Sequence, residues 1–155
     1  MEVSIHENMC DKSTMKVADV LRKPFEELSD ILSGEYGGVI EHLWIDFELI
    51  ESWAKEDGKA RYPFRFQKRV SGRSHFGLPP SPDKYNVGHY SVRPDFGLIT
   101  ELSNEDIIRY ALSLIYDSTS VLLEKKNGLK GFDATLFRKN FLQGCCAIGY
   151  QLLNA

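Results

Sequence analysis

The 155-residue sequence predicts an α+β fold in which an antiparallel sheet of about three or more strands carries helices packed on one face. Two observations support this class. Segments with the alternating pattern of half-buried strands are grouped in the middle of the chain, and segments with helical periodicity lie before and after them. The alternation itself favours antiparallel strands, because parallel strands buried on both faces usually read as unbroken apolar runs. The expected element order is α-β-β-β-α-α.

The first expected element is a helix that begins near Thr14. Residues 1–13 show no period and are interpreted as a flexible leader, so a single α+β domain is expected over residues 14–155. Beyond the leader, apolar residues recur every three or four positions up to Leu32, which is typical of one helix face. Gly34 and the pair Gly37-Gly38 are expected to end this helix.

Three strands are expected next. Residues 39–50 alternate strongly, residues 62–70 alternate more weakly, and residues 85–92 are compatible with a third strand that Gly88 weakens. The first two are expected to be close neighbours, as in a hairpin. Residues 71–83 between the second and third strands are rich in glycine and proline and predict a long loop.

Two helices complete the predicted fold. Ser103 precedes three polar or acidic residues, which is the pattern of a helix start that benefits from a capping hydroxyl and from negative charge near the helix N-terminus. Asn127-Gly128 is expected to end this helix. Asp133 is expected to cap the last helix, whose apolar face extends to Leu152.

Composition excludes several classes of protein. The chain is 43% hydrophobic and 26% charged, as in ordinary globular domains, and it has no apolar run long enough to cross a membrane. Its first residues lack the apolar core of an export signal, so a cytoplasmic location is expected. The three cysteines lack metal-ligand spacing, and no nucleotide-binding or catalytic motif is found, so neither metal nor cofactor is predicted and the chain is not expected to be an enzyme.

Charge is distributed unevenly along the chain. Residues 1–60 contain 14 acidic and 6 basic residues, whereas residues 61–98 contain 2 acidic and 7 basic residues. If neighbouring strands carry these charges, they would pair across the sheet and stabilise it. Otherwise they would form two separate surfaces, one suited to a basic partner and one to an acidic partner or a phosphate backbone.

Two candidate sites follow from this asymmetry. The first is a partner-binding patch on the polar side of the first strand, where an aromatic residue lies among acidic ones; its residues are Glu41, His42, Trp44, Asp46, Glu48 and Glu51. The second is a basic, histidine-containing segment within residues 61–93, suited to phosphate or nucleic acid and, if its two histidines meet, to acid-base catalysis; its residues are Arg65, Arg69, Arg73, His75, His89 and Arg93.

The stretch His42-Leu43-Trp44-Ile45-Asp46-Phe47-Glu48 and its acidic surroundings resemble the immunity proteins of bacterial contact-dependent growth inhibition and other polymorphic toxin systems. The resemblance covers about the first third of the chain. It implies a binding protein that occludes the active site of a toxin domain, often a basic nuclease, with acidic residues in place of phosphates. The alternative is a small nucleic-acid-binding protein or a phosphodiesterase or nuclease-like enzyme that uses residues 61–93. A third possibility is a subunit whose exposed sheet edge pairs with another chain.

Overall fold

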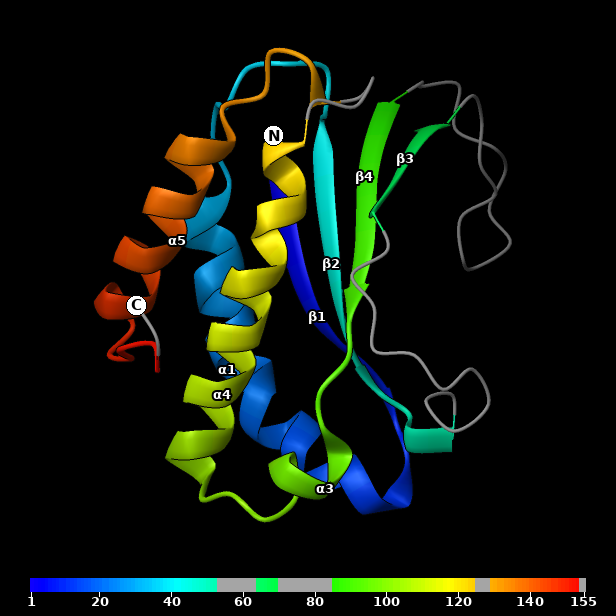
Figure 1. Cartoon of the computed structure of the whole chain (residues 1–155), viewed down its shortest axis with the longest axis vertical. Helices are drawn as coiled ribbons and strands as arrows, with labels where there is room; N and C mark the ends of the chain where they lie inside the picture. The colour runs from blue at the N-terminus through cyan, green and yellow to red at the C-terminus, as the bar shows by residue number, and fades with distance from the viewer. Residues whose placement is uncertain (53–63, 70–84, 125–128, 154–155) are drawn as a thin grey trace.

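The computed structural model describes residues 1–52, 64–69, 85–124 and 129–153. These form one four-stranded sheet with helices on one side of it (Figure 1). The strands and helices are β1 (Glu2–Cys10), α1 (Met15–Leu32), β2 (His42–Leu49), β3 (Phe64–Arg69), β4 (Tyr85–Val92), α3 (Phe96–Ile99), α4 (Asn104–Ser118) and α5 (Ala134–Ala147), with short 3-10 segments at Lys12–Thr14 and Thr119–Leu123.

The predicted antiparallel sheet is wrong. The strand order is β1-β2-β4-β3; β1 pairs with β2 and β2 with β4 in parallel, and only β3 runs antiparallel, against β4. The expected pairing of the first two predicted strands is wrong too, because β2 lies between β1 and β4 and not beside β3. The physical reason is that alternation reports how many faces of a strand are buried and not the direction of its neighbour.

The predicted flexible leader is also corrected, because most of residues 1–13 form β1, an edge strand of the sheet. Val3 and Ile5 are buried among the core residues, and Glu2 is the register partner of His42. Two parallel neighbours need a crossover connection, and α1 supplies it between β1 and β2. In the sequence, apolar and polar residues alternate only over residues 2–6 of this strand, which is too short a stretch to predict a strand firmly.

The predicted helices agree better with the structure than the predicted sheet does. α1 runs without interruption through Pro24, Ser103 caps α4 by accepting a hydrogen bond from the backbone N–H of Asp106, and Asp133 caps α5 in the same way from Leu136. α4 ends at Ser118 and α5 ends at Ala147, both before their predicted ends, and the 3-10 segment Thr119–Leu123 follows α4. The short helix α3 was not predicted.

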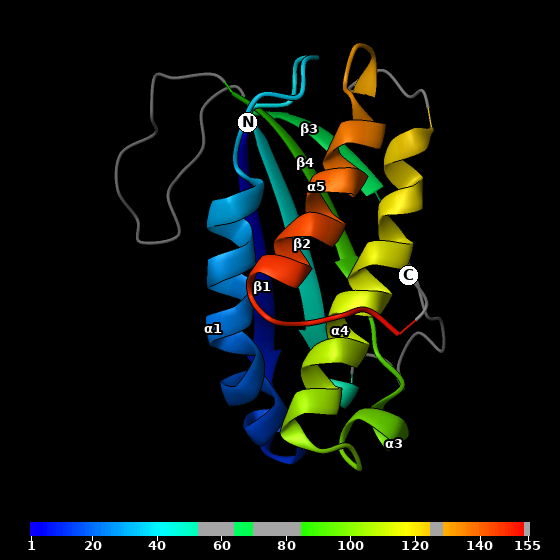
Figure 2. The same cartoon turned by 90° about the vertical axis from the view of Figure 1, so that its left-hand side faces the viewer.

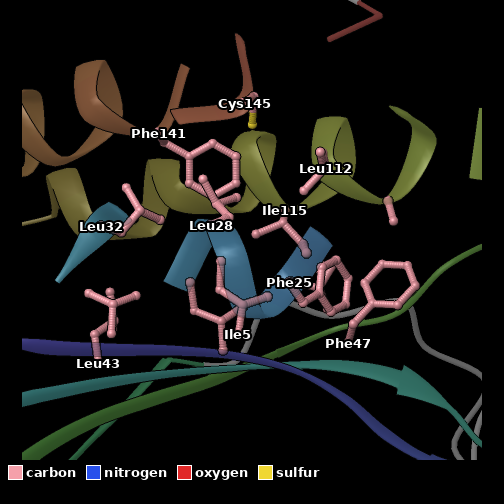
Figure 3. Packing of buried hydrophobic residues seen from close by; sticks show 14 of the residues in the cluster. Ile5, Phe25, Leu28, Leu32, Leu43, Phe47, Leu112, Ile115, Phe141 and Cys145 are labelled. Carbon is pink, nitrogen blue, oxygen red and sulfur yellow. The ribbon is translucent and has the colours of Figure 1, made fainter. Parts of the chain in front are cut away.

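The core lies between the sheet and the three long helices. Figure 2 shows α1 and α4 side by side over the sheet with α5 crossing outside them. Figure 3 shows the sheet residues Ile5, Leu43 and Phe47 facing Phe25 and Leu28 of α1, with Ile115 of α4 and Phe141 of α5 beyond. Every odd-numbered residue of β2 is buried in this layer, so its even-numbered residues lie on the opposite face of the sheet.

Side chains from α1 and from its C-cap residue, Ser33, protect the free edge of β1. The Ser33 hydroxyl accepts a hydrogen bond from the backbone N–H of Val3, and the Ser29 hydroxyl accepts one from Ile5 at 2.9 Å and donates to the Phe25 carbonyl. An exposed edge strand otherwise offers its amides to another chain. Strand addition at this part of β1 is therefore blocked.

Replacing Ser29 by alanine is expected to lower the free energy of unfolding by about 1–3 kcal/mol, because the buried amide of Ile5 loses its acceptor. Urea denaturation followed by circular dichroism measures this loss. The matched control is Ser120→Ala at an exposed position, which should change stability by less than about 0.5 kcal/mol. Equal stability of the two variants would show that the Ser29 bond does not hold the edge.

Candidate functional site

The described helices leave the second face of the sheet uncovered (Figure 1). Alternation along the three parallel strands places polar and aromatic side chains there, and their registers bring them side by side. We call this surface the open face; it comprises Glu2, Ser4 and His6 of β1, His42, Trp44, Asp46 and Glu48 of β2, and His89, Ser91 and the following Arg93 of β4.

Trp44 lies at the centre of the open face, half-buried, with a histidine on each side. The His6 ring centroid is 4.9 Å from the Trp44 ring centroid, His42 stacks at 5.6 Å, and His89 meets the ring edge-on at 6.4 Å. The three histidines come from three different strands. The aromatic centre therefore depends on the parallel pairing of β1, β2 and β4.

Asp46 holds this cluster in place through two hydrogen bonds. Its Oδ1 accepts from the Trp44 indole N–H at 2.8 Å, and its Oδ2 lies 2.6 Å from His89 Nε2. The side chain is only 19% exposed. Both carboxylate oxygens are thus engaged within the protein.

The carboxylate of Glu48 is also paired within the protein, with the guanidinium of Arg93. A carboxylate oxygen lies 2.8 Å from Arg93 Nε, and the Arg93 side chain is only 9% exposed. The charges of the first candidate site therefore meet those of the second across the β2–β4 pair, as the complementary-charge interpretation expects. In this pair the positive charge comes from Arg93, which directly follows β4.

The two candidate sites predicted from sequence are thus partly one surface. His42, Trp44, Asp46 and Glu48 share the open face with His89 and Arg93 of the alternative basic site. Glu41 lies exposed just before β2, and Glu51 is half-buried after it.

Two residues of the alternative basic site, Arg65 and Arg69, lie in β3, and two others, Arg73 and His75, follow it in the sequence. In the strand registers, Arg65 is the partner of His89 and Arg69 that of Tyr85. Arg73 and His75 lie outside the described residues, so the structure does not test whether His75 meets His89.

Sequence reasoning missed the β1 half of the site. Glu2, Ser4 and His6 were assigned to a leader, yet they complete the open face beside β2. The signal was present in the alternation of Glu2, Ser4 and His6 with Val3 and Ile5, although it covers only five residues.

One group of side chains resembles a nucleophilic triad but lacks an essential part. Ser4 Oγ is 2.8 Å from His42 Nε2, and His42 Nδ1 is 3.8 Å from a carboxylate oxygen of Glu2. Acyl transfer also needs free backbone amides that stabilise the developing oxyanion. The amides that flank Ser4 already donate to Ser33 and Ser29. Among the described residues, the arrangement therefore serves to fix the position of His42.

Metal binding at this face receives no support from the described residues. No group of three or more histidine, cysteine, aspartate or glutamate side chains in that part of the chain is placed to hold a metal ion. In the same ranges, no helix combines the length and apolar composition that a membrane crossing requires.

The cysteines lie away from the open face and differ in burial. Cys145 is fully buried in the core between the helices, and burial raises the pKa of its thiol to about 12 (Figure 3). Cys146 beside it is exposed.

We expect a thiol reagent at pH 8 to modify Cys146 rapidly and to leave Cys145 unmodified until the protein unfolds, because the thiolate is the reactive form and the Cys145 thiolate is disfavoured up to a pKa of about 12. Mass spectrometry of the modified peptides, in native buffer and in urea, provides the readout. Equal rates at the two cysteines in native buffer would contradict the buried placement of Cys145.

The fold and the open face together define an α+β domain with one helix-covered sheet face and one polar, aromatic sheet face. Comparison with known protein families, curated proteins and solved structures finds no match to this chain.

Proposed function

We propose that the chain is a cytoplasmic protein-binding domain, an immunity protein that neutralises a cognate toxin domain by docking the open face over the toxin's active site. The observation that carries this proposal is the position of Trp44 at the centre of a sheet face that the described helices leave uncovered. Central tryptophans surrounded by side chains that exclude water supply much of the energy of protein interfaces.

The open face is preorganised around this tryptophan. Asp46 fixes the indole through its N–H, and the histidines on both sides restrict the rotation of the ring. An interface residue that is already held in one rotamer loses less entropy on binding. Trp44 is therefore better suited to anchoring a rigid partner than a freely rotating surface aromatic would be.

Charge around the open face favours a basic partner. Residues 1–52 contain 12 acidic and 4 basic residues. Glu2 is 73% exposed and Glu41 is exposed at the start of β2. Glu26 and Asp30 of α1 line a cleft of about 440 Å³ beside the β1 edge of the sheet, together with Arg22. Complementary charge at the rim accelerates encounter with an oppositely charged partner, such as a basic nuclease.

The structure changes the role that the sequence suggested for two acidic residues of β2. Asp46 and Glu48 were expected to take the place of phosphates, but both are paired inside the domain. These acids support Trp44 and Arg93, and the peripheral carboxylates provide the attraction to the toxin.

The rival proposals have less support. A phosphate backbone on the open face would approach Glu2, Asp46 and Glu48, and the Arg93 charge is already compensated by Glu48. Arg65, the register partner of His89 on β3, is the position that would favour a phosphate. Pairing through a sheet edge is blocked at Val3 and Ile5 of β1. A protein partner of basic character is therefore the function that the described residues favour.

Co-expression with the product of the reading frame immediately upstream tests the proposal, because immunity proteins resembling this chain are normally encoded directly downstream of their toxins. We expect the two chains to elute as one complex in size-exclusion chromatography and the toxicity of the upstream product to disappear. Separate elution together with undiminished toxicity would reject the proposed function.

A further inference from the structure

We propose that the open face is self-complementary, and that two copies of this chain pair face to face through it with the β1 edge of one copy over the β3 edge of the other. The proposal starts from charged residues that are divided along the strand order β1-β2-β4-β3. It goes beyond the proposed function and does not rest on it, because no toxin takes part in the pairing.

β3 continues the open face with basic residues. Arg65 is the register partner of His89, and residues that pair across neighbouring strands lie on the same face of a sheet. The alternation of the strand places Gln67 and Arg69 on this face as well. Two arginine positions of the open face therefore lie on the strand at one end of the strand order.

The opposite side of the open face is acidic. Glu2 of β1 has a side chain that is 73% exposed, and β2 adds Asp46 and Glu48. The acidic residues thus lie on the first two strands of the order, whereas the basic residues lie on β3 or directly after β4. At the described positions, the three acidic residues Glu2, Asp46 and Glu48 stand against the three basic residues Arg65, Arg69 and Arg93.

The inner charges are compensated within one copy. Asp46 lies 2.6 Å from His89, and Glu48 lies 2.8 Å from Arg93. A second copy therefore acts mainly on the charges at the two edges. In the registers, Glu2 of β1 lies in the same row of side chains as Gln67 of β3, and the two arginines of β3 lie one row to either side, roughly 7 Å along the strand.

This division of charge selects one arrangement of two copies. A two-fold axis parallel to the strands, above the midline between β2 and β4, places β1 opposite β3 of the other copy and β2 opposite its β4. Glu2 of each copy then faces the row between Arg65 and Arg69 of the other. An axis across the strands would instead bring acid over acid and arginine over arginine, which electrostatic complementarity disfavours.

The same axis gives the contact an aromatic centre. Trp44 and His89 are register partners on either side of the midline, so Trp44 of each copy lies opposite His89 of the other. A tryptophan at the centre with charged residues at the rim is the usual composition of a protein interface.

The size of the sheet predicts a weak and reversible dimer. Two sheets that pack face to face lie about 10 Å apart with their strands within about 30° of each other. Strands of six to nine residues, spaced about 4.8 Å apart, give a footprint of roughly 20 by 25 Å. Such a contact is at the low end of specific interfaces, where transient complexes lie. We therefore expect a dissociation constant in the micromolar range, so that dilution exposes the open face again.

Charge-reversed variants test the arrangement by sedimentation velocity over micromolar to millimolar concentrations. Glu2→Lys and the double variant Arg65→Glu/Arg69→Glu each place like charges on the facing edges, so each should self-associate at least tenfold more weakly than the unaltered chain. An equimolar mixture of the two variants should dimerise again, because both edge contacts of the mixed dimer join opposite charges. Circular dichroism checks that each variant is folded.

Three results of this experiment would overturn the proposal. They are a chain that stays monomeric at every concentration, variants that dimerise as well as the unaltered chain, and a mixture that remains as monomeric as its components. Salt provides a readout that needs no variant: high ionic strength should weaken the dimer, because exposed edge charges are screened. A dimer that salt leaves unchanged would contradict the edge contacts.

Trp44 reports whether the dimer forms through the open face. Trp53 is the other tryptophan of the chain, so Trp53→Phe leaves Trp44 as the only indole. Quenching of its fluorescence by acrylamide should decrease as the protein concentration rises and the dimer forms. Unchanged quenching during dimer formation would place the contact elsewhere and overturn the proposal.

Addition of the upstream product separates this inference from the proposed function. Both use the open face, so we expect the toxin complex to contain a single copy of this chain. A toxin complex that retains the charge-dependent dimer would reject docking of the toxin on the open face and leave the dimer standing. A chain that binds the toxin but never dimerises would overturn the dimer and leave the proposed function standing.

Discussion

Replacing Phe47 by alanine is expected to lower the free energy of unfolding by about 3–5 kcal/mol, the largest stability effect that we predict. Phe47 is fully buried at the contact between β2 and α1, and its ring meets Phe25 edge-on at a centroid distance of 5.9 Å. Truncation removes this contact and leaves a cavity beneath three helices that cannot all move inward. Urea denaturation followed by circular dichroism measures the loss.

Met9→Ala is the matched control for this prediction. Met9 also lies in the sheet, but its side chain is 71% exposed, so its removal should change stability by less than about 0.5 kcal/mol. Similar losses for Phe47→Ala and Met9→Ala would contradict the placement of the core on the helix side of β2.

Replacing Trp44 by alanine is expected to weaken binding of the cognate toxin domain by at least about 2 kcal/mol, or roughly 30-fold. The variant loses the aromatic anchor of the open face, whereas the buried core on the other side of β2 is unchanged. Isothermal titration calorimetry gives the affinity, and thermal unfolding checks that the fold is retained. Trp44→Phe should have an intermediate effect, because it keeps an aromatic ring but loses the hydrogen bond to Asp46.

The control for Trp44 is Lys139→Ala. Lys139 is an exposed residue of α5 on the helix side of the molecule, so its removal should leave the affinity unchanged. Charge reversal at Asp46 is a less specific test, because it would disrupt both Trp44 and His89. An affinity that is insensitive to Trp44→Ala and falls with Lys139→Ala would locate the interface on the helices.

Local patterns in the sequence predicted most of the elements. β2, β3 and β4 lie within the predicted strands, and α1, α4 and α5 lie within the predicted helices. Capping residues such as Asp133 act within one turn and are visible in the sequence. Strand direction was not predictable in this way, because each strand alternates whether its neighbour is parallel or antiparallel.

The candidate site was predicted only in part for the same reason. The alternation of β2 correctly placed Trp44 and Asp46 together on the polar face. The contacts of Asp46 with His89 and of Glu48 with Arg93 join residues more than forty positions apart, and only the β2–β4 register brings them together. The alternation of β1 is too short to predict a strand that contains His6, so the aromatic centre could not be recognised from the sequence.

Chemical footprinting of the histidines tests most directly whether the open face is the binding surface. Diethyl pyrocarbonate modifies accessible imidazoles, and peptide mass spectrometry reads out each of them in the free protein and in the complex with the upstream product. The proposal predicts that His6, His42 and His89 are modified in the free chain and protected in the complex. Unchanged modification of all three histidines in a complex that has formed would contradict it.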